Sequence, residues 1–246
     1  MKYLIFLTFF AFFSCRDDKG VDNESDFLDN YEVVAAYGFN NNFEDNTSNE
    51  IDLISTDVEF VNDRDDNENS AVSFNGNSSF LRNNYTNILD LSPQFTLSVW
   101  VKPDLANCKG DQLDYIDVVG RWFATGRLQG SYSICLLKNG TIEGRTYDYE
   151  MSHSNTWIPT EDKVIDNEWN NIIITRNETG ILLIYLNGEL VANGFVNPPQ
   201  VSEYELYIGK RSDNRSIYAG AIDDVLIIDE FVAEKDIKKL MDYSID

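Results

Sequence analysis

Aromatic and arginine side chains concentrate in the middle of the sequence, and their combination is typical of sugar binding. The aromatic residues of this segment are Trp122, Tyr132, Tyr147, Tyr149 and Trp157, and its arginines are Arg121, Arg127 and Arg145. A ring offers a flat apolar surface to a sugar, and a guanidinium donates directed hydrogen bonds. The predicted ligand-binding residues are Arg121, Trp122, Arg145, Tyr147, Tyr149 and Trp157. The alternative is that many of these rings belong to the core.

His153 and the acidic run 63–69 could also be functional, the first in catalysis and the second in metal binding, but each has a non-functional alternative. His153, the only histidine, could act as a general acid or base, but no Ser or Cys pattern for nucleophilic catalysis surrounds it. An ordinary loop histidine is the favoured interpretation. The run 63–69 alternates oxygen-bearing side chains as an EF-hand loop does, but lacks the glycine at the sixth position and the glutamate at the twelfth. This pattern favours a solvated acidic loop.

The amino terminus predicts export. Lys2 precedes an apolar run over 4–13 and then Ser14-Cys15, so residues 1–14 have the pattern of a secretory signal peptide, too short to span a membrane. The cysteine at this junction resembles a bacterial lipobox, which implies lipidation of Cys15 and membrane contact through that anchor only. Asp17-Asp18 resembles the acidic signal of Bacteroidetes-type lipoproteins, which implies surface exposure on the outer membrane. A plain signal peptide with an incidental cysteine is the alternative.

Cys108 and Cys135 remain once Cys15 is lipidated. An even pair of cysteines in an exported protein predicts a disulfide. Such a bond would join the polar segment 104–115 to a neighbouring strand and would stabilise the fold by about 3 kcal/mol. A free, buried thiol at Cys135 is the alternative.

Strands must position most of these residues. Short apolar segments are separated by Gly, Asn and Pro, which is the pattern of consecutive β-strands. The expected strands cover 33–39, 70–76, 79–81, 95–103, 116–123, 132–137, 143–149, 169–176, 181–186, 190–192, 206–209 and 220–228. Asn187-Gly188 tolerates the positive φ of a type I′ turn, which predicts a hairpin. Residues 15–30 form an acidic tether, 151–166 form a long loop, and apolar spacings of three and four over 233–243 predict one short helix.

Composition supports a folded core and excludes one class of partner. Of the 246 residues, 43% are hydrophobic, which argues against intrinsic disorder despite a formal charge of −23. A nucleic-acid-binding protein would need a basic face, and 19 basic against 42 acidic residues offer none. The sequence therefore predicts no nucleic-acid partner.

The order of landmarks near the carboxyl end resembles a known family. These landmarks are Trp169-Asn170-Asn171-Ile172, Tyr185-Leu186-Asn187-Gly188, Ile208-Gly209 and Gly220-Ala221-Ile222-Asp223-Asp224-Val225. They are similar to the closing half of the concanavalin A-like, laminin-G-like jelly roll of bacterial surface proteins. The resemblance implies that residues 31–246 form one all-β domain, an antiparallel β-sandwich with one short C-terminal helix.

The same resemblance implies a structural calcium ion. Asn40 and Asp45 lie in an Asn- and Asp-rich loop that resembles the opening motif of the family, and Asp223 lies in its closing motif. The family places these two segments side by side, and oxygen ligands are what Ca²⁺ requires. The expected metal ligands are therefore Asn40, Asp45 and Asp223. A turn-rich loop and a hydrogen-bonded strand residue form the alternative.

The sequence therefore predicts a lipid-anchored surface protein with a non-catalytic recognition domain for carbohydrate. A structural or adhesive module that binds a surface protein is the second interpretation. A polysaccharide-degrading glycoside hydrolase is the third, because the spacing of Asp223-Asp224 and Asp229-Glu230 differs from the carboxylate pattern of glucanases with this fold.

Overall fold

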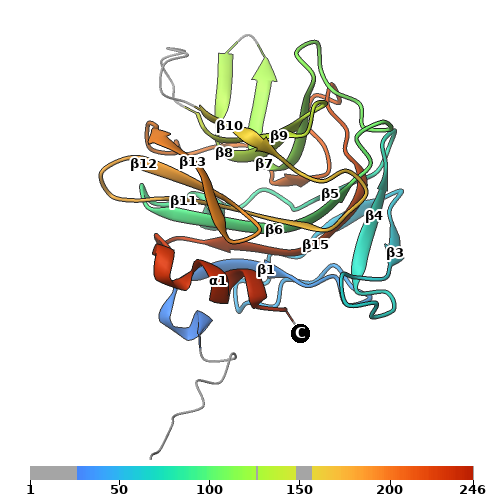
Figure 1. The fold of residues 1–246 in the computed structure, drawn as a ribbon, viewed down its shortest axis with the longest axis horizontal. Coiled ribbons are helices and arrows are strands. Elements are labelled where there is room, and N and C mark those ends of the chain that lie inside the picture. The colour runs from blue at the N-terminus through green and yellow to red at the C-terminus, as the bar shows by residue number, and fades with distance from the viewer. Residues whose placement is uncertain (1–26, 126, 148–156, 246) are drawn as a thin grey trace, which may run out of the picture.

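The strands form two antiparallel sheets that pack face to face, as Figure 1 shows. A computed structural model describes residues 27–125, 127–147 and 157–245. In sheet A the strand order is β13-β12-β11-β6-β15-β4-β3, and β1 pairs with β15. Its strands are β1 (Val33–Tyr37), β3 (Glu59–Val61), β4 (Ala71–Asn75), β6 (Phe95–Pro103), β11 (Asn170–Arg176), β12 (Ile181–Leu186), β13 (Glu189–Phe195) and β15 (Ala219–Ile228).

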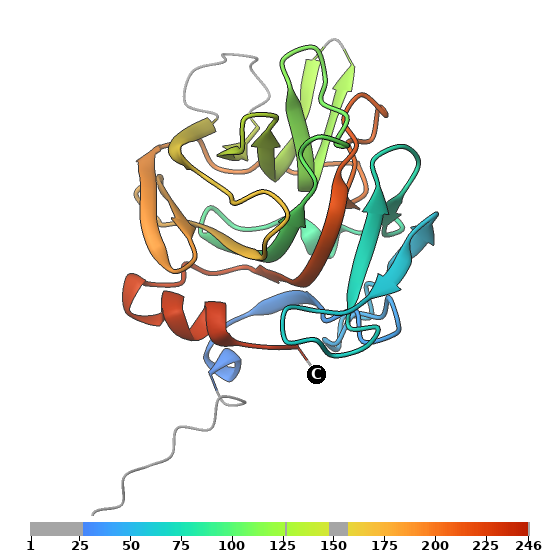
Figure 2. The ribbon, with the colours of Figure 1, turned by 45° about the vertical axis from the view of Figure 1, so that its right-hand side comes forward.

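Sheet B has the strand order β10-β9-β8-β7-β14-β5-β2. Its strands are β2 (Ile54–Thr56), β5 (Phe80–Arg82), β7 (Tyr115–Thr125), β8 (Arg127–Leu137), β9 (Thr141–Thr146), β10 (Trp157–Lys163) and β14 (Tyr207–Ile208). The paired ends of β7 and β8 extend beyond the sandwich at the top of Figures 1 and 2.

Alternation along the strands builds the core between the sheets. Ile172 and Ile174 of β11 are fully buried in this core together with Ile134 and Leu136 of β8. Successive side chains of a strand point to opposite faces, so Ile173 points away from the core. The hairpin predicted at Asn187-Gly188 forms between β12 and β13, with positive φ at both residues.

The outer face of sheet A is covered by apolar contacts. Ile173, Leu226 and Ile228 pack against Ile237 and Leu240 of helix α1 (Glu234–Asp242). Figure 1 shows α1 lying below this sheet, on the side away from sheet B. The helix therefore fills the apolar side that alternation leaves outside the core.

The segment before β1 also packs on this face. Phe27, Leu28 and Tyr31 contact the same apolar cluster, and residues Leu28–Asn30 form the short 3-10 helix η2. The end of the predicted tether over 15–30 is thus part of the folded unit. The predicted signal peptide over 1–14, Cys15 and the tether before residue 27 lie outside the described residues.

The predicted all-β sandwich with one short C-terminal helix is confirmed. Three short or polar strands, β2, β3 and β10, were not predicted. β10 lies within the segment 151–166 that the sequence predicts as a loop, because an edge strand exposes most of its side chains and needs no apolar alternation. Among the described residues, no helix is long and apolar enough to cross a membrane.

Candidate functional site

The outer face of sheet B carries polar and aromatic side chains, whereas the part of sheet A that packs against α1 is apolar. The polar and aromatic side chains come from β7, β8 and β9 and from Tyr147, which follows β9 directly. The residues of this polar face are Tyr115, Asp117, Trp122, Ser133, Cys135, Glu143, Arg145 and Tyr147. Their neighbours Ile116, Ile134 and Ile142 point into the core between the sheets.

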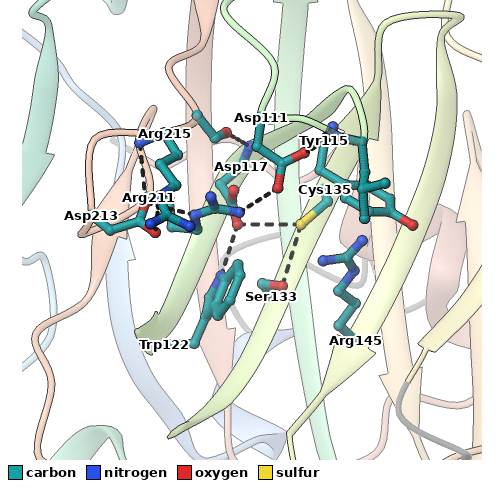
Figure 3. A network of polar contacts seen from close by, with 12 residues as sticks. Asp111, Tyr115, Asp117, Trp122, Ser133, Cys135, Arg145, Arg211, Asp213 and Arg215 are labelled. Atoms are coloured by element: carbon teal, nitrogen blue, oxygen red, sulfur yellow. Dashed lines mark hydrogen bonds and ion pairs between the residues drawn. The ribbon is translucent and has the colours of Figure 1, made fainter. Parts of the chain in front are cut away.

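Asp117 connects the centre of the polar face. Its Oδ1 accepts hydrogen bonds from Nε1 of Trp122 at 2.7 Å and from Sγ of Cys135 at 3.4 Å. Its backbone N–H donates to Oγ of Ser216. Figure 3 shows these contacts within one network. Asp117 thus ties β7 to β8 through its carboxylate and to the loop before β15 through its backbone N–H.

Trp122 and Tyr147 form an aromatic pair on this face. Their rings stack with centroids 4.7 Å apart, and the hydroxyls of Tyr147 and Ser133 share a hydrogen bond of 3.1 Å. Both rings are only 4% exposed. Burial raises the pKa of the Tyr147 hydroxyl well above its usual value, so this group stays neutral and hydrogen-bonded.

Arg211 lies beside Trp122 and between two aspartates. Its guanidinium donates to Asp111 at 2.8 Å and to Asp213 at 2.7 Å, and it lies 5.0 Å from the centroid of the Trp122 ring. Burial acts to lower the pKa of Arg211, but the hydrogen bonds with Asp213 and Asp111 raise it overall. This cation therefore fixes the two loops at the edge of the polar face (Figure 3).

Arg145 occupies the other side of the polar face. Two of its nitrogens donate to Oε2 of Glu143, at 2.6 and 2.9 Å, and its guanidinium lies 3.9 Å from the centroid of the Tyr115 ring. Trp157 is opposite Arg145 in the β9–β10 register and is 39% exposed. The polar face therefore meets solvent at an exposed indole beside a fixed ion pair.

The structure brings four of the predicted ligand-binding residues together. Trp122, Arg145, Tyr147 and Trp157 lie on or next to adjacent strands, but only Trp157 is exposed. Tyr149 lies outside the described residues.

The structure does not place Arg121 where the prediction expected it, because its side chain is fully buried. It donates to Oδ1 of Asp90 and to the carbonyl oxygens of Thr86, Ser202 and Tyr204. The β7–β8 register shifts between Asp117 and Val119, and this reverses the alternation along the rest of β7, so Arg121 leaves the polar face. Its role is to hold two loops in place, not to bind a ligand.

The predicted disulfide also requires a correction. Within the described part of the chain, Cys108 and Cys135 are both free and buried. Cys108 belongs to the core between the sheets and accepts a hydrogen bond from the backbone of Ala219, whereas Cys135 lies on the polar face beside Asp117. Because β8 separates these two environments, the sulfurs do not meet. Burial raises the pKa of Cys108 to about 11, which keeps its thiol protonated.

The first two expected calcium ligands are engaged in protein contacts. The two carboxylate oxygens of Asp45 accept hydrogen bonds from the backbone of Ala36, Thr47 and Ile51 and from the Thr47 hydroxyl. The side-chain amide of Asn40 donates to the carbonyl oxygen of Ile245. Asp45 therefore holds its own loop in place through these hydrogen bonds, and Asn40 links the same loop to Ile245.

Asp223, the third expected ligand, is paired with a cation of the protein itself. Arg64 Nη1 donates to Asp223 at 2.9 Å and to Asp224 at 2.6 Å, and its guanidinium lies 4.8 Å from the centroid of the Trp100 ring. No group of three or more His, Cys, Asp or Glu side chains suited to a metal occurs among the described residues. These residues do not fit a calcium ion, because Arg64 already supplies the positive charge.

Several charged residues on or beside the polar face had no signal in the sequence. Asp111 and Asp117 are far along the chain from Arg211 and Asp213, and the four fit no motif. Their charges become connected only when the loop 211–216 folds against β7.

The two antiparallel sheets and the short C-terminal helix form a concanavalin A-like jelly roll. The chain belongs to the concanavalin A-like lectin/glucanases superfamily, whose family model matches residues 66–238. No curated protein matches the sequence significantly.

Solved structures share the fold at low sequence identity. Domain 4 of the extracellular arabinanase AbnA from Geobacillus stearothermophilus, solved with arabinotriose, matches with a TM-score of 0.57 and 19% identity, over 85% of this chain and 98% of that one. The botulinum neurotoxin serotype D ligand-binding domain, solved with N-acetylneuraminic acid, has a TM-score of 0.62 and 17% identity, over 88% and 52%. The binding domain of Paraclostridial Mosquitocidal Protein 1 has a TM-score of 0.61 and 17% identity, over 87% and 52%. The chain thus spans about half the length of these toxin domains.

Proposed function

We propose that this protein recognises carbohydrate without catalysis, at the surface of the outer membrane, where a lipid on Cys15 anchors it. The proposal combines the predicted lipoprotein leader with the polar face of sheet B. It is supported by the family and by two neighbours whose solved structures contain arabinotriose and N-acetylneuraminic acid.

The observation that carries the proposal is the exposed Trp157 beside Arg145 and Glu143. An exposed indole can stack on the apolar face of a sugar ring. Next to it, the largely buried guanidinium of Arg145 keeps 10% exposure and can donate to a sugar hydroxyl. Because Glu143 and the Tyr115 ring already fix Arg145, little ordering is needed on binding.

A glycan array with the purified protein tests this assignment. We expect selective binding by the wild type, and a loss of about tenfold in affinity for Trp157→Ala. Leu190→Ala, which truncates an exposed side chain on sheet A, is the matched control and should bind normally. Unchanged binding by Trp157→Ala would place the ligand elsewhere.

The same experiment separates the other two interpretations. An array without any binding would contradict carbohydrate recognition and favour a protein-binding adhesive module. Cleavage of a bound polysaccharide would favour a glycoside hydrolase. The anchor is tested separately, because Cys15→Ser should release the protein from the membrane fraction.

A further inference from the structure

A pocket of about 320 Å³ lies between two loops, and none of its lining residues belongs to the polar face. Its volume falls within the range of roughly 300–1,000 Å³ typical of small-molecule sites. One wall is the segment 49–52, and the other is the segment 83–88, which follows β5. The lining residues of this loop pocket are Asn49, Glu50, Ile51, Asp52, Asn83, Asn84, Tyr85, Thr86 and Ile88.

Two buried charged residues hold the walls of the loop pocket in place. Asp45 accepts hydrogen bonds from the backbone of Thr47 and Ile51 and thereby fixes the first wall. Arg121 donates to the carbonyl oxygen of Thr86 and to Asp90, and so fixes the second. A pocket whose walls are already ordered loses little conformational entropy when a ligand binds.

The side chains of the loop pocket combine an exposed ring with an unused hydrogen-bond donor. Tyr85 is 52% exposed, and Ile88 beside it is 45% exposed. Asn83 is only 1% exposed, and its Oδ1 accepts from the backbone of Leu206, which fixes the orientation of the amide. Its Nδ2 has no hydrogen-bond partner among the described residues. A buried donor without a partner is costly, and a bound hydroxyl or ring oxygen would satisfy it.

We propose that the loop pocket is a second ligand site that takes one neutral sugar ring. The Tyr85 ring would stack on the apolar face of the sugar. The amides of Asn83 and Asn84 would donate to its oxygens, and the carboxylates of Glu50 and Asp52 would accept from its hydroxyls.

The charge of the loop pocket selects against acidic sugars. Glu50 and Asp52 are both exposed, and none of the nine described lining residues is basic. A sugar carboxylate would therefore face like charges, and Arg121, whose guanidinium lies 5.8 Å from the centroid of the Tyr85 ring, is fully buried and already paired with Asp90. This distinguishes the loop pocket from the polar face, where Arg145 and Arg211 supply positive charge.

Titration of the ¹⁵N-labelled protein with methyl glycosides of glucose, galactose, mannose and arabinose tests the proposal by NMR. At least one glycoside should shift the backbone amides of 49–52 and 83–88. Tyr85→Ala should lower the affinity measured from these shifts about tenfold. Trp157→Ala is the matched control, since it alters the other site and should leave the loop-pocket shifts unchanged.

The outcomes for the two sites are distinguishable. Shifts confined to 143–145 and 157 would support the polar face and overturn the second site. Shifts at 49–52 and 83–88 that survive Tyr85→Ala would contradict the stacking role. Glucuronate binding as tightly as methyl glucoside would overturn the assignment to a neutral sugar, and weaker binding would support it.

Discussion

The outer faces of the two sheets follow the same strand alternation but carry different chemistry. On sheet A the outward side chains include Ile173, Leu226 and Ile228, and α1 covers them. On sheet B they include Asp117 and Arg145, which join hydrogen bonds and ion pairs. An apolar face is stabilised by being covered, whereas buried polar groups are stabilised by hydrogen bonds and ion pairs with one another.

Charge is handled differently on the two faces. On sheet A, Asp223 and Asp224 are buried together and share one cation, Arg64. On sheet B, Arg211 has two carboxylate partners, and Arg145 pairs with Glu143 one to one. Two carboxylates thus share one cation on sheet A, whereas Arg145 and Arg211 beside sheet B each have at least one carboxylate of their own.

The largest expected effect comes from opening the covered face of sheet A. Leu240→Ala should lower the free energy of unfolding by about 2–5 kcal/mol, because Leu240 is 1% exposed and its loss leaves a cavity under α1. Urea denaturation measures this change. Lys238→Ala, on the exposed side of the same helix, is the control and should change it by less than about 0.5 kcal/mol. An equal loss in both variants would mean that helix propensity, not the cover, determines stability.

A smaller effect is expected when the ionic contacts beside the polar face are broken. Arg211→Met should destabilise by about 2 kcal/mol, below the 3–5 typical of fully buried pairs, because the side chains of Asp111 and Asp213 keep 10% exposure. Arg215→Met is the matched control, since that side chain is 67% exposed and its pair with Asp213 should contribute little. If Arg211→Met unfolds as the wild type does, the loops do not depend on this cation.

The third effect depends on pH and concerns Asp223. Burial and the neighbouring Asp224 raise its pKa to about 8, and Arg64 offsets only part of this. Because the folded pKa lies above the unfolded one, the contribution to stability is complete below about pH 4 and is lost as the pH rises through about 8.

Asp223→Asn isolates this contribution, because the amide keeps the shape and remains neutral. Urea denaturation between pH 4 and pH 9 should show the wild type losing stability relative to the variant as the pH rises. Parallel curves for the two proteins would show that Asp223 titrates normally in the folded state.

The smallest expected effect is that of removing divalent cations. EDTA should leave the melting temperature unchanged within about 1 °C, since Arg64 holds Asp223 and no cation is needed there. Arg64→Met should lower the melting temperature without creating a response to EDTA. A wild type that EDTA destabilises would restore Asp45 and Asp223 as metal ligands.

Local pattern alone predicted most of the strands and the terminal helix, whereas the sandwich was predicted from the family resemblance. The apolar runs at 95–103, 169–176 and 220–228 are strands in the structure, and Ile237, Leu240 and Met241 lie on the terminal helix. These elements were predictable because periodicity and turn chemistry act over a few residues. The landmark motifs likewise predicted the family.

The direction in which side chains point in β7 was decided by tertiary structure. Simple alternation from the buried Ile116 would put Arg121 on the outer face and Trp122 in the core. The β7–β8 register shifts between Asp117 and Val119, and this reverses the alternation along the rest of β7, so Trp122 reaches the outer face and Arg121 is buried against Asp90. Such shifts depend on how strands from distant segments pair, which no short window of sequence records.

The partners of the charged residues were also decided by the fold. The sequence led us to predict Asp45 and Asp223 as metal ligands and Arg145 as a ligand-binding residue. It did not predict that Arg64 would donate a hydrogen bond to Asp223 from 159 positions away. Nor did spacing reveal that β8 would keep Cys108 and Cys135 on opposite sides. Sequence determines which groups are present and which strands form, whereas their partners depend on which segments the sandwich brings together.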